Sequence, residues 1–351
     1  MSRVCVLALL ATITACASLA PPRYRGPITD HFDGERFHNY GPDTDEQVSA
    51  GIIQELHRPE GRANWAFWEN TPPSVPPSRV GNGRVLVTLV NHATVLVQMD
   101  SLNILTDPIW SRHASPLASF GPLRHRPPGI EWDSLPPIDL VLVSHNHYDH
   151  MDLHTLRRVS RRFHPVILVG LGNAAFLERN GIKGARDMDW WQTVEVKPGI
   201  RISGVPAQHY SQRSFTDRWR TLWLGFVIAG PSGRIYFAGD TGLGGFLVSI
   251  RERFAPLRLA ILPIGPGLPV RAMGPQHMSA GDAIEAYKML GVTAAFGMHF
   301  GTFQQGDETQ SGPTEWLKRV IDAQACEINF WSGTNGESWD VPQRTSEPRC
   351  S

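Results

Sequence analysis

The sequence predicts a mixed α/β fold in which two β-sheets pack together with helices on their outer faces. Three observations predict it: a meander of apolar strands begins after residue 83, strands and helices then alternate, and this alternation occurs twice. The chain has 351 residues, of which 41% are hydrophobic and 19% are charged, so it can form a packed core.

The first half contains the meander and the first strand–helix alternation, with a loop over 110–137 between them. Runs of β-branched and aliphatic residues predict the strands, and amphipathic spacing predicts the helices. The predicted strands are 84–90, 94–99, 104–106, 139–144 and 166–169, and the predicted helices are 153–163 and 173–180, the second closed by Gly181.

The second half repeats this pattern. Ser279 is a suitable helix cap, Asp282 lies three residues later, and the apolar spacing that follows predicts a helix over 279–290. The predicted strands are 193–196, 200–205, 223–228, 234–238, 259–263 and 294–298.

The N-terminus has the features of a targeting segment. Ile13-Thr14-Ala15-Cys16 resembles a lipobox, which implies a lipid-modified Cys16 and a location at the bacterial cell envelope, on the periplasmic face of the outer membrane. The alternative is a plain signal peptide cut near Ala15 or Ala20. We therefore expect a lipoprotein signal peptide at 1–15, an anchor linker and N-terminal extension at 16–80 with a short helix over 45–57, and the folded domain at 81–345.

The net charge bears on nucleic-acid binding, and the cysteine content bears on disulfide pairing. Lys plus Arg and Asp plus Glu are 33 each, and this zero net charge gives no support to nucleic-acid binding. Cys326 and Cys350 either pair in an oxidising compartment or stay unpaired, and their spacing does not decide between the two.

The strongest functional signal is Ser144-His145-Asn146-His147-Tyr148-Asp149-His150, directly after a predicted buried strand. Imidazole nitrogens and carboxylate oxygens are the ligands that zinc and related ions prefer. A tight turn can direct alternate residues at one ion and then bring Asp149 and His150 to a second, whereas Tyr148 is out of phase and expected to pack.

Further ligand-type residues follow three later strands. His209, Asp240 and His299 each come directly after a predicted strand end. Each alone fits a buried histidine or a turn carboxylate, but together with the cluster they indicate one metal centre.

The motif HxHxDH at 145–150, with His209, Asp240 and His299, resembles the metallo-β-lactamase superfamily over residues 83–302. The resemblance implies an αββα sandwich with two metal ions, expected to be zinc. One ion would bind His145, His147 and His209, the other Asp149, His150 and His299, and Asp240 would bridge both.

A narrower resemblance is to the N-acylphosphatidylethanolamine-hydrolysing phospholipase D family. It is carried by ordered segments, among them Asn91-His92-Ala93-Thr94, Leu105-Thr106-Asp107-Pro108, Pro206-Ala207-Gln208-His209-Tyr210, Pro275-Gln276-His277-Met278 and His299-Phe300-Gly301. It implies hydrolysis of N-acyl phosphatidylethanolamine or a related glycerophospholipid, by attack of a metal-bridging hydroxide on phosphorus.

Several residues have predicted supporting roles. Asp240, and with it Asp149, would serve catalysis as well as metal binding, and His277 would contact a phosphate oxygen or protonate the leaving group. Asp107 is expected to orient a metal-binding histidine, its alternative being a turn before Pro108, and His92 is expected to support the site.

Two other functions remain open at this stage. The same metals would suit a hydrolase of carboxylic esters, lactones or β-lactams, and an envelope scaffold without catalysis is a further alternative. A set of tryptophans, either core residues or the lining of a lipid-accepting groove, consists of Trp190, Trp191, Trp219 and Trp223.

Overall fold

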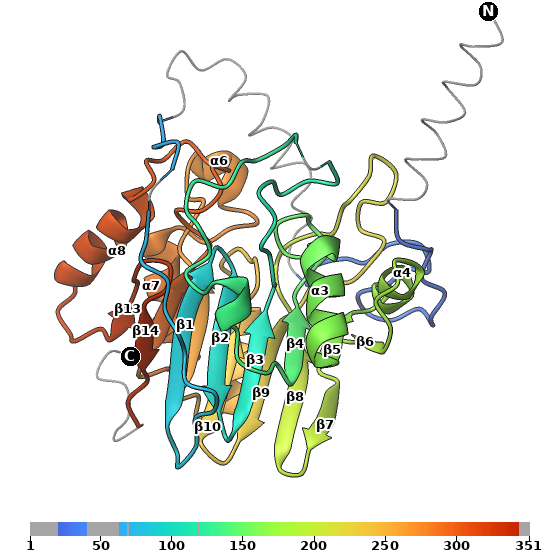
Figure 1. Cartoon of the computed structure of the whole chain (residues 1–351), viewed down its shortest axis with the longest axis horizontal. Helices are drawn as coiled ribbons and strands as arrows, with labels where there is room; N and C mark the ends of the chain where they lie inside the picture. Colours follow the sequence, from blue (N-terminus) through green and yellow to red (C-terminus); the bar gives the residue numbers. More distant parts are fainter. Residues whose placement is uncertain (1–19, 41–62, 69, 118, 344–351) are drawn as a thin grey trace, which may run out of the picture.

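The computed structural model describes residues 20–40, 63–68, 70–117 and 119–343 and has two seven-stranded sheets packed face to face (Figure 1). This confirms the predicted fold class. In the order of its strands, the first sheet contains β14 (Ser338–Asp340), β1 (Val85–Asn91), β2 (Thr94–Met99), β3 (Leu102–Thr106), β4 (Leu140–Val143), β5 (Val166–Gly170) and β6 (Ala185–Met188). The second contains β13 (Phe330–Trp331), β12 (Ala295–Met298), β11 (Leu259–Pro263), β10 (Gly233–Phe237), β9 (Gly225–Gly230), β8 (Ile200–Val205) and β7 (Thr193–Lys197).

Both sheets are mixed in the same way. β1, β2 and β3 pair antiparallel, and β3 to β6 pair parallel. In the second sheet β7 to β10 pair antiparallel, and β10 to β13 pair parallel. Because parallel strands end at the same edge, residues that follow β4, β10 and β12 are brought to a common end of the sandwich.

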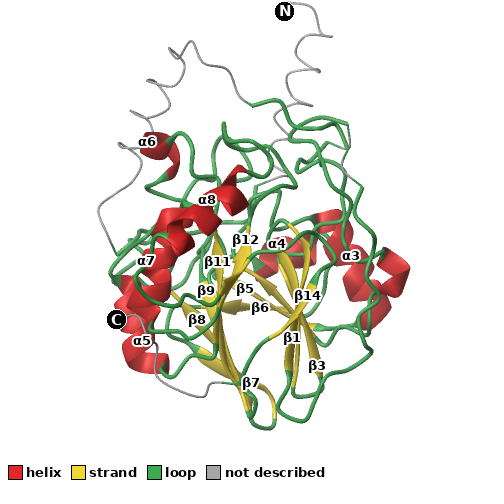
Figure 2. Ribbon diagram, turned by 90° about the vertical axis from the view of Figure 1, so that its left-hand side faces the viewer, coloured by secondary structure: helices red, strands yellow, loops and turns green. Residues whose placement is uncertain are grey.

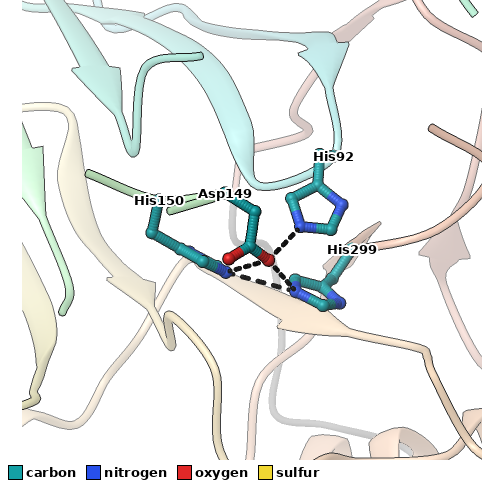
Figure 3. A group of neighbouring side chains, drawn as sticks. All are labelled: His92, Asp149, His150 and His299. Atoms are coloured by element: carbon teal, nitrogen blue, oxygen red, sulfur yellow. Dashed lines mark hydrogen bonds and ion pairs between the residues drawn. The ribbon is translucent and has the colours of Figure 1, made fainter. Parts of the chain in front are cut away.

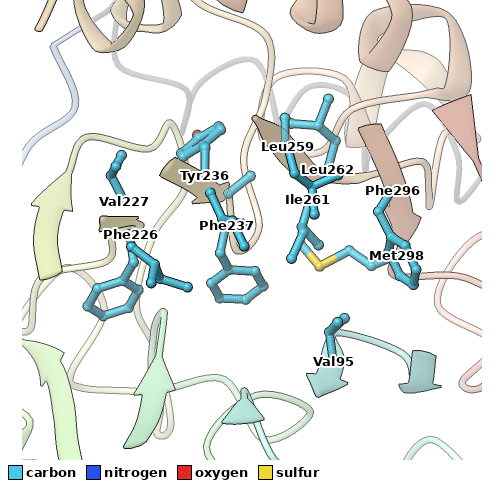
Figure 4. Packing of buried hydrophobic residues seen from close by; sticks show 14 of the residues in the cluster. Val95, Phe226, Val227, Tyr236, Phe237, Leu259, Ile261, Leu262, Phe296 and Met298 are labelled. Carbon is cyan, nitrogen blue, oxygen red and sulfur yellow. The ribbon is translucent and has the colours of Figure 1, made fainter. Parts of the chain in front are cut away.

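The core lies between the sheets, where apolar side chains from the two inner faces meet. Phe226 and Phe237 of the second sheet are fully buried and point toward the strand of the first sheet that carries Val95 (Figure 4). Burying such side chains stabilises the fold by about 1.5–3 kcal/mol each. This packing fixes the two sheets relative to each other, and with them the positions of the residues at the strand ends.

Helices cover the outer faces, with α3 and α4 on one side and α5, α7 and α8 on the other (Figure 2). Asp152 caps α3, and Ser279 and Asp282 form the predicted capping box of α7. The helices are α3 (Leu153–Phe163), α4 (Ala174–Arg179), α5 (Phe246–Phe254), α6 (Val270–Met273), α7 (Ala280–Leu290), α8 (Gly312–Asp322) and the 3₁₀ turn η1 (Trp132–Ser134). The structure thus confirms the helices predicted at 153–163, 173–180 and 279–290, to within a residue at each end.

Some elements were not predicted. Three of them are the short strands β6, β13 and β14, which are two to four residues long and exist because they pair with neighbouring strands. Three more are the helices α5, α6 and α8. The groove interpretation is wrong for Trp190, Trp219 and Trp223, which are at most 5% exposed and belong to the core, while Trp191 is half-buried at its edge.

Several predictions concern residues outside the described ranges. The signal peptide, Cys16 and the helix over 45–57 fall there. Cys326 lies in a disulfide bond, but Cys350 is also outside the described ranges, so their pairing stays a prediction. No helix within the described ranges is long and apolar enough to cross a membrane.

Candidate metal centre

The histidine cluster lies in a tight turn directly after β4. The turn closes through bonds from the His150 and Met151 amides to the His147 carbonyl, at 3.2 and 2.8 Å. Ser144, which begins the turn, accepts a bond at 3.0 Å from the Leu224 amide, which belongs to the other half of the sandwich. The turn is therefore held between the two sheets, where later ligands can reach it.

Three histidines form a first group of ligand atoms. His147 Nδ1 lies 2.8 Å from His145 Nε2 and 3.2 Å from His209 Nε2. His209 follows β8 and reaches the group from the second sheet. Three imidazole nitrogens that converge at these distances can hold a metal ion.

A second group lies beside the first and contains a carboxylate (Figure 3). Asp149 Oδ2 lies 3.3 Å from His150 Nε2, 3.6 Å from His299 Nε2 and 2.9 Å from His92 Nε2. His299 follows β12 and His92 follows β1, so this group also joins both sheets. All four side chains are buried.

Asp240, which follows β10, lies between the two groups. Its Oδ2 is 3.1 and 3.0 Å from the Nε2 atoms of His150 and His299, and 4.0 and 3.8 Å from those of His145 and His209. Its Oδ1 is buried without a hydrogen-bond partner. The structure thus brings together all seven predicted ligands, and Asp240 has the placement of a bridging carboxylate.

The partners of the rings show which nitrogens are free for a metal. His150 Nδ1 is 2.7 Å from Asp107 Oδ2, His209 Nδ1 is 3.0 Å from the Gln276 carbonyl, and His299 Nδ1 is 2.9 Å from the Gly265 carbonyl. When Nδ1 donates to such an acceptor, Nε2 keeps its lone pair, and this arrangement is typical of metal-binding histidines. Together with the orphaned oxygen of Asp240, the donor set fits divalent metal cations that favour nitrogen and oxygen ligands.

The pKa values of the three histidines in the first group also agree with metal binding. Burial lowers the pKa of His147 to about 3 and holds those of His145 and His209 well below the ordinary histidine range. These rings are neutral near pH 7, as metal ligands must be.

In the second group, charged neighbours outweigh the effect of burial on the pKa values. Burial acts to raise the pKa of Asp240, but His150 and His299 outweigh it and hold this pKa well below its usual value. Burial acts to lower the pKa of His299, but Asp240 and Asp149 together outweigh it and raise that pKa to about 9. The ring protons thus compensate buried carboxylates, a role that cations would take over.

The residues with predicted supporting roles lie around these groups. Asp107 accepts from His150, and also from the Ser144 amide and hydroxyl at 2.7 and 2.6 Å. His277 Nδ1 is buried without a hydrogen-bond partner, 3.7 Å from Asp240 Oδ2, and the side chain is 15% exposed. The Tyr148 hydroxyl donates to the Arg213 carbonyl at 2.7 Å.

Three of these residues have left-handed backbone conformations, which are uncommon outside glycine. The φ angles are 47° at His92, 33° at Asp107 and 64° at His299. Such conformations persist only where the surrounding structure enforces them, and they gather at functional sites.

Other contacts of the centre were not predicted. Gln305 Nε2 donates to Asp149 Oδ2 at 2.7 Å, and Asn39 contacts the backbone of His209. The carbonyls of Gln276 and Gly265, which orient His209 and His299, are backbone groups that every residue has, so the sequence does not mark them. In the segment Gln276-His277 the histidine side chain is a recognisable candidate, whereas the Gln276 carbonyl has no feature that distinguishes it in the sequence.

Comparisons with known sequences agree with this geometry. A beta-lactamase superfamily domain matches residues 102–300. The N-acyl-phosphatidylethanolamine-hydrolyzing phospholipase D 1 of Caenorhabditis elegans is 34% identical over 274 residues, which cover 74% of this chain and 77% of that protein. The mitochondrial N-acyl-phosphatidylethanolamine-hydrolyzing phospholipase D of Saccharomyces cerevisiae is 34% identical over 277 residues, covering 77% of this chain but only 56% of that protein. A metal-dependent hydrolase of Methanopyrus kandleri is 30% identical over 261 residues, covering 72% and 99%.

Solved structures show the same fold. A metallo hydrolase of Ignicoccus hospitalis has a TM-score of 0.55 at 22% identity, covering 74% of this chain and 100% of that one. An isothiocyanate hydrolase from Delia radicum gut bacteria has a TM-score of 0.57 at 20% identity, covering 72% and 98%. At these identities the likeness concerns the fold alone.

Proposed function

This chain belongs to the β-lactamase superfamily of metal-dependent hydrolases, and from this we propose that it is a zinc-dependent phosphodiesterase of the phospholipase D type. The proposed substrate is N-acyl phosphatidylethanolamine or a related glycerophospholipid. The proposed cofactor is a pair of zinc ions held by His145, His147, His209, Asp149, His150, His299 and Asp240.

One observation carries the choice of substrate. The nematode enzyme named for this reaction is 34% identical over 77% of its length, and that alignment covers 74% of this chain. The buried groups of histidine and carboxylate donor atoms, which could hold metal ions, support the metal-dependent part of the proposal. When bound, the ions would provide Lewis acidity toward the phosphate and activate water for attack on phosphorus.

The protein's own groups have separate parts in this proposal. Asp240 holds both ligand groups together through Oδ2. His277 borders the cluster, and burial lowers its pKa to about 4, so its ring is neutral near pH 7. A neutral imidazole can donate a hydrogen bond to a phosphate oxygen, and this supports the phosphate-binding role of His277 over that of a proton donor.

The test is hydrolysis of N-acyl phosphatidylethanolamine in mixed micelles by zinc-loaded protein that begins at Ala17. Mass spectrometry should detect N-acylethanolamine and phosphatidic acid, and Asp240→Asn should abolish both. If the zinc-loaded protein releases neither, the lipid assignment fails while the metal centre stands. Esters, lactones, β-lactams and simple phosphodiesters would then be assayed with the same pair of proteins.

We further propose that Cys16 carries a lipid anchor at the cell envelope, which would place the chain at a membrane that contains its substrate. Fractionation of cells that express the full chain tests this. The wild type should pellet with membranes and take up labelled palmitate, and Cys16→Ser should do neither. Equal behaviour of the two proteins would contradict the anchor.

A further inference from the structure

Residues 20–40, called here the N-terminal strap, precede the matched superfamily region by some sixty residues but pack against the domain beside α4 (blue in Figure 1). Phe32 and Phe37 are fully buried and contact each other at a ring separation of 4.5 Å. The Phe37 amide donates to the Trp219 carbonyl at 2.8 Å. The strap is therefore an integrated part of the fold.

The strap carries Asn39 to the backbone of a predicted metal ligand. Asn39 Nδ2 donates to the His209 carbonyl at 3.0 Å, and the His209 amide donates to Asn39 Oδ1 at 3.2 Å. One side-chain amide thus pairs with both backbone groups of the same residue, as a neighbouring strand would.

His209 needs such a partner because it has left the sheet. The pairing of β8 with β9 ends at Val205, four residues earlier. Among the described residues, only Asn39 bonds to the N–H and C=O of His209. Without Asn39 these two backbone groups would lose their hydrogen bonds in a buried place, which is unfavourable because water cannot replace the lost partner there.

A third contact sets the orientation of the Asn39 amide. Trp223 Nε1 donates to Asn39 Oδ1 at 2.9 Å and to the Ala207 carbonyl at the same distance. Asn39 Oδ1 therefore accepts from two N–H groups, those of the His209 backbone and the Trp223 ring. If the amide were flipped, its NH₂ group would lie against these two donors and could not accept from them. Only the observed orientation pairs with both groups of His209.

The ring of His209 is held separately by the Gln276 carbonyl, 3.0 Å from Nδ1, and its Nε2 lies 3.2 Å from His147 Nδ1. Asn39 thus sets the position of the backbone and Gln276 the rotation of the ring.

We propose that Asn39 is a positioning residue of the metal centre, which pairs with both backbone groups of His209 and so places its Nε2 in the three-histidine group. The N-terminal strap is then part of the functional site. The inference rests on the metal centre of the proposed function, but not on the identity of the substrate.

The experiment measures zinc affinity of the full folded chain by competition with a chromophoric chelator. Asn39→Asp has nearly the same shape but presents an oxygen to the His209 carbonyl, and Asn39→Ala removes the amide. Both should weaken zinc binding by about 10–100-fold, as loss of such partners usually does. Cobalt-substituted Asn39→Asp should also show altered visible absorption, since the geometry around a histidine ligand changes.

Two control variants separate positioning from general stability. Tyr40→Phe removes bonds of the strap to Asp30 and Trp191 without touching Asn39, and Asn335→Ala removes a remote buried amide that donates to the Pro127 carbonyl. Both should keep wild-type zinc affinity, even if the metal-free proteins melt earlier.

The proposal is overturned if both Asn39 variants keep the zinc affinity and cobalt spectrum of the wild type, or if the controls lose affinity equally. It is also overturned if the wild-type chain binds no metal. Absence of lipid hydrolysis by a wild type that binds zinc would contradict the phospholipase function alone, because the readout here is metal binding.

Discussion

At the scale of single residues, the histidines of the metal centre are oriented by partners far away in the sequence. His150 depends on Asp107, His209 on the Gln276 carbonyl and His299 on the Gly265 carbonyl. Side-chain ligands could be predicted from the sequence because histidines and aspartates cluster in a recognisable spacing. Backbone partners could not, since any residue type supplies the same carbonyl.

The Asp107 carboxylate accepts from His150 and twice from Ser144, and Asp107→Asn tests its role. Asparagine would keep its oxygen on the Ser144 backbone N–H, which can only donate, and place its NH₂ group at the position of Oδ2, where it faces both His150 Nδ1 and the Ser144 hydroxyl. His150 should therefore lose its orientation. We expect zinc affinity or kcat/KM to fall by about 10–100-fold. Asp133→Asn, at a carboxylate that is 99% exposed, is the matched control. Wild-type zinc content and kinetics in Asp107→Asn would refute the role.

A second residue-scale prediction concerns His277, which borders the cluster with an unpartnered Nδ1. His277→Ala should keep its zinc but lose about 10²-fold in kcat, the usual effect of removing one donor to developing charge. His277→Gln retains an N–H donor and should recover part of the loss. Loss of zinc in both variants would instead assign His277 to metal binding.

At the scale of elements, helices with explicit end signals were predicted well. The capping box of Ser279 and Asp282 places the start of α7 within one residue. α8 was not predicted, although Pro313 lies in its first turn, where proline is common. β14 has three residues and exists because β1 pairs with it, so its own sequence has little information.

The N-terminal strap has a pH-sensitive contact at His31. Its ring lies 2.6 Å from Asp30 and 2.8 Å from Asp189 and stacks on Trp190, and Tyr40 donates to the far oxygen of Asp30. Burial acts to lower the pKa of His31, but the two carboxylates outweigh it and raise this pKa above its ordinary value of 6.5. The protonated ring therefore stabilises the strap fully below pH 6.5, and this stabilisation is lost as pH rises through the folded pKa.

His31→Gln should remove this dependence. The difference in melting temperature between wild type and variant should be largest at about pH 6 and shrink toward about pH 9. Thermal unfolding of both proteins in one buffer series provides the measurement. A difference that stays constant over this range would mean that the ring acts by packing alone.

At the scale of the whole molecule, the metal centre joins the two sheets. The cluster after β4 belongs to the first sheet, whereas His209, Asp240 and His299 follow strands of the second. The two-sheet architecture could be predicted from the repeated alternation of strands and helices. The docking of the strap could not, because it depends on pairings between segments more than a hundred residues apart, such as His31 with Asp189.

Metal bound between the sheets should stabilise the whole fold. At a free zinc concentration of 100 times the dissociation constant, linkage predicts about 2.7 kcal/mol of added stability. Chelation should lower the melting temperature, and added zinc should restore it. Asp240→Asn, which weakens both ligand groups, should respond less. Equal melting of chelated and zinc-loaded wild type would contradict metal binding.

The separation of the ligands along the chain also affects when metal can be acquired during biosynthesis. The set begins at His145 and ends at His299, so a growing chain lacks a complete site until most of it has been made. A chain that crosses a membrane unfolded would assemble the site only on the far side. The ions available in that compartment would then determine which metal is bound, because availability as well as affinity decides metal choice in cells.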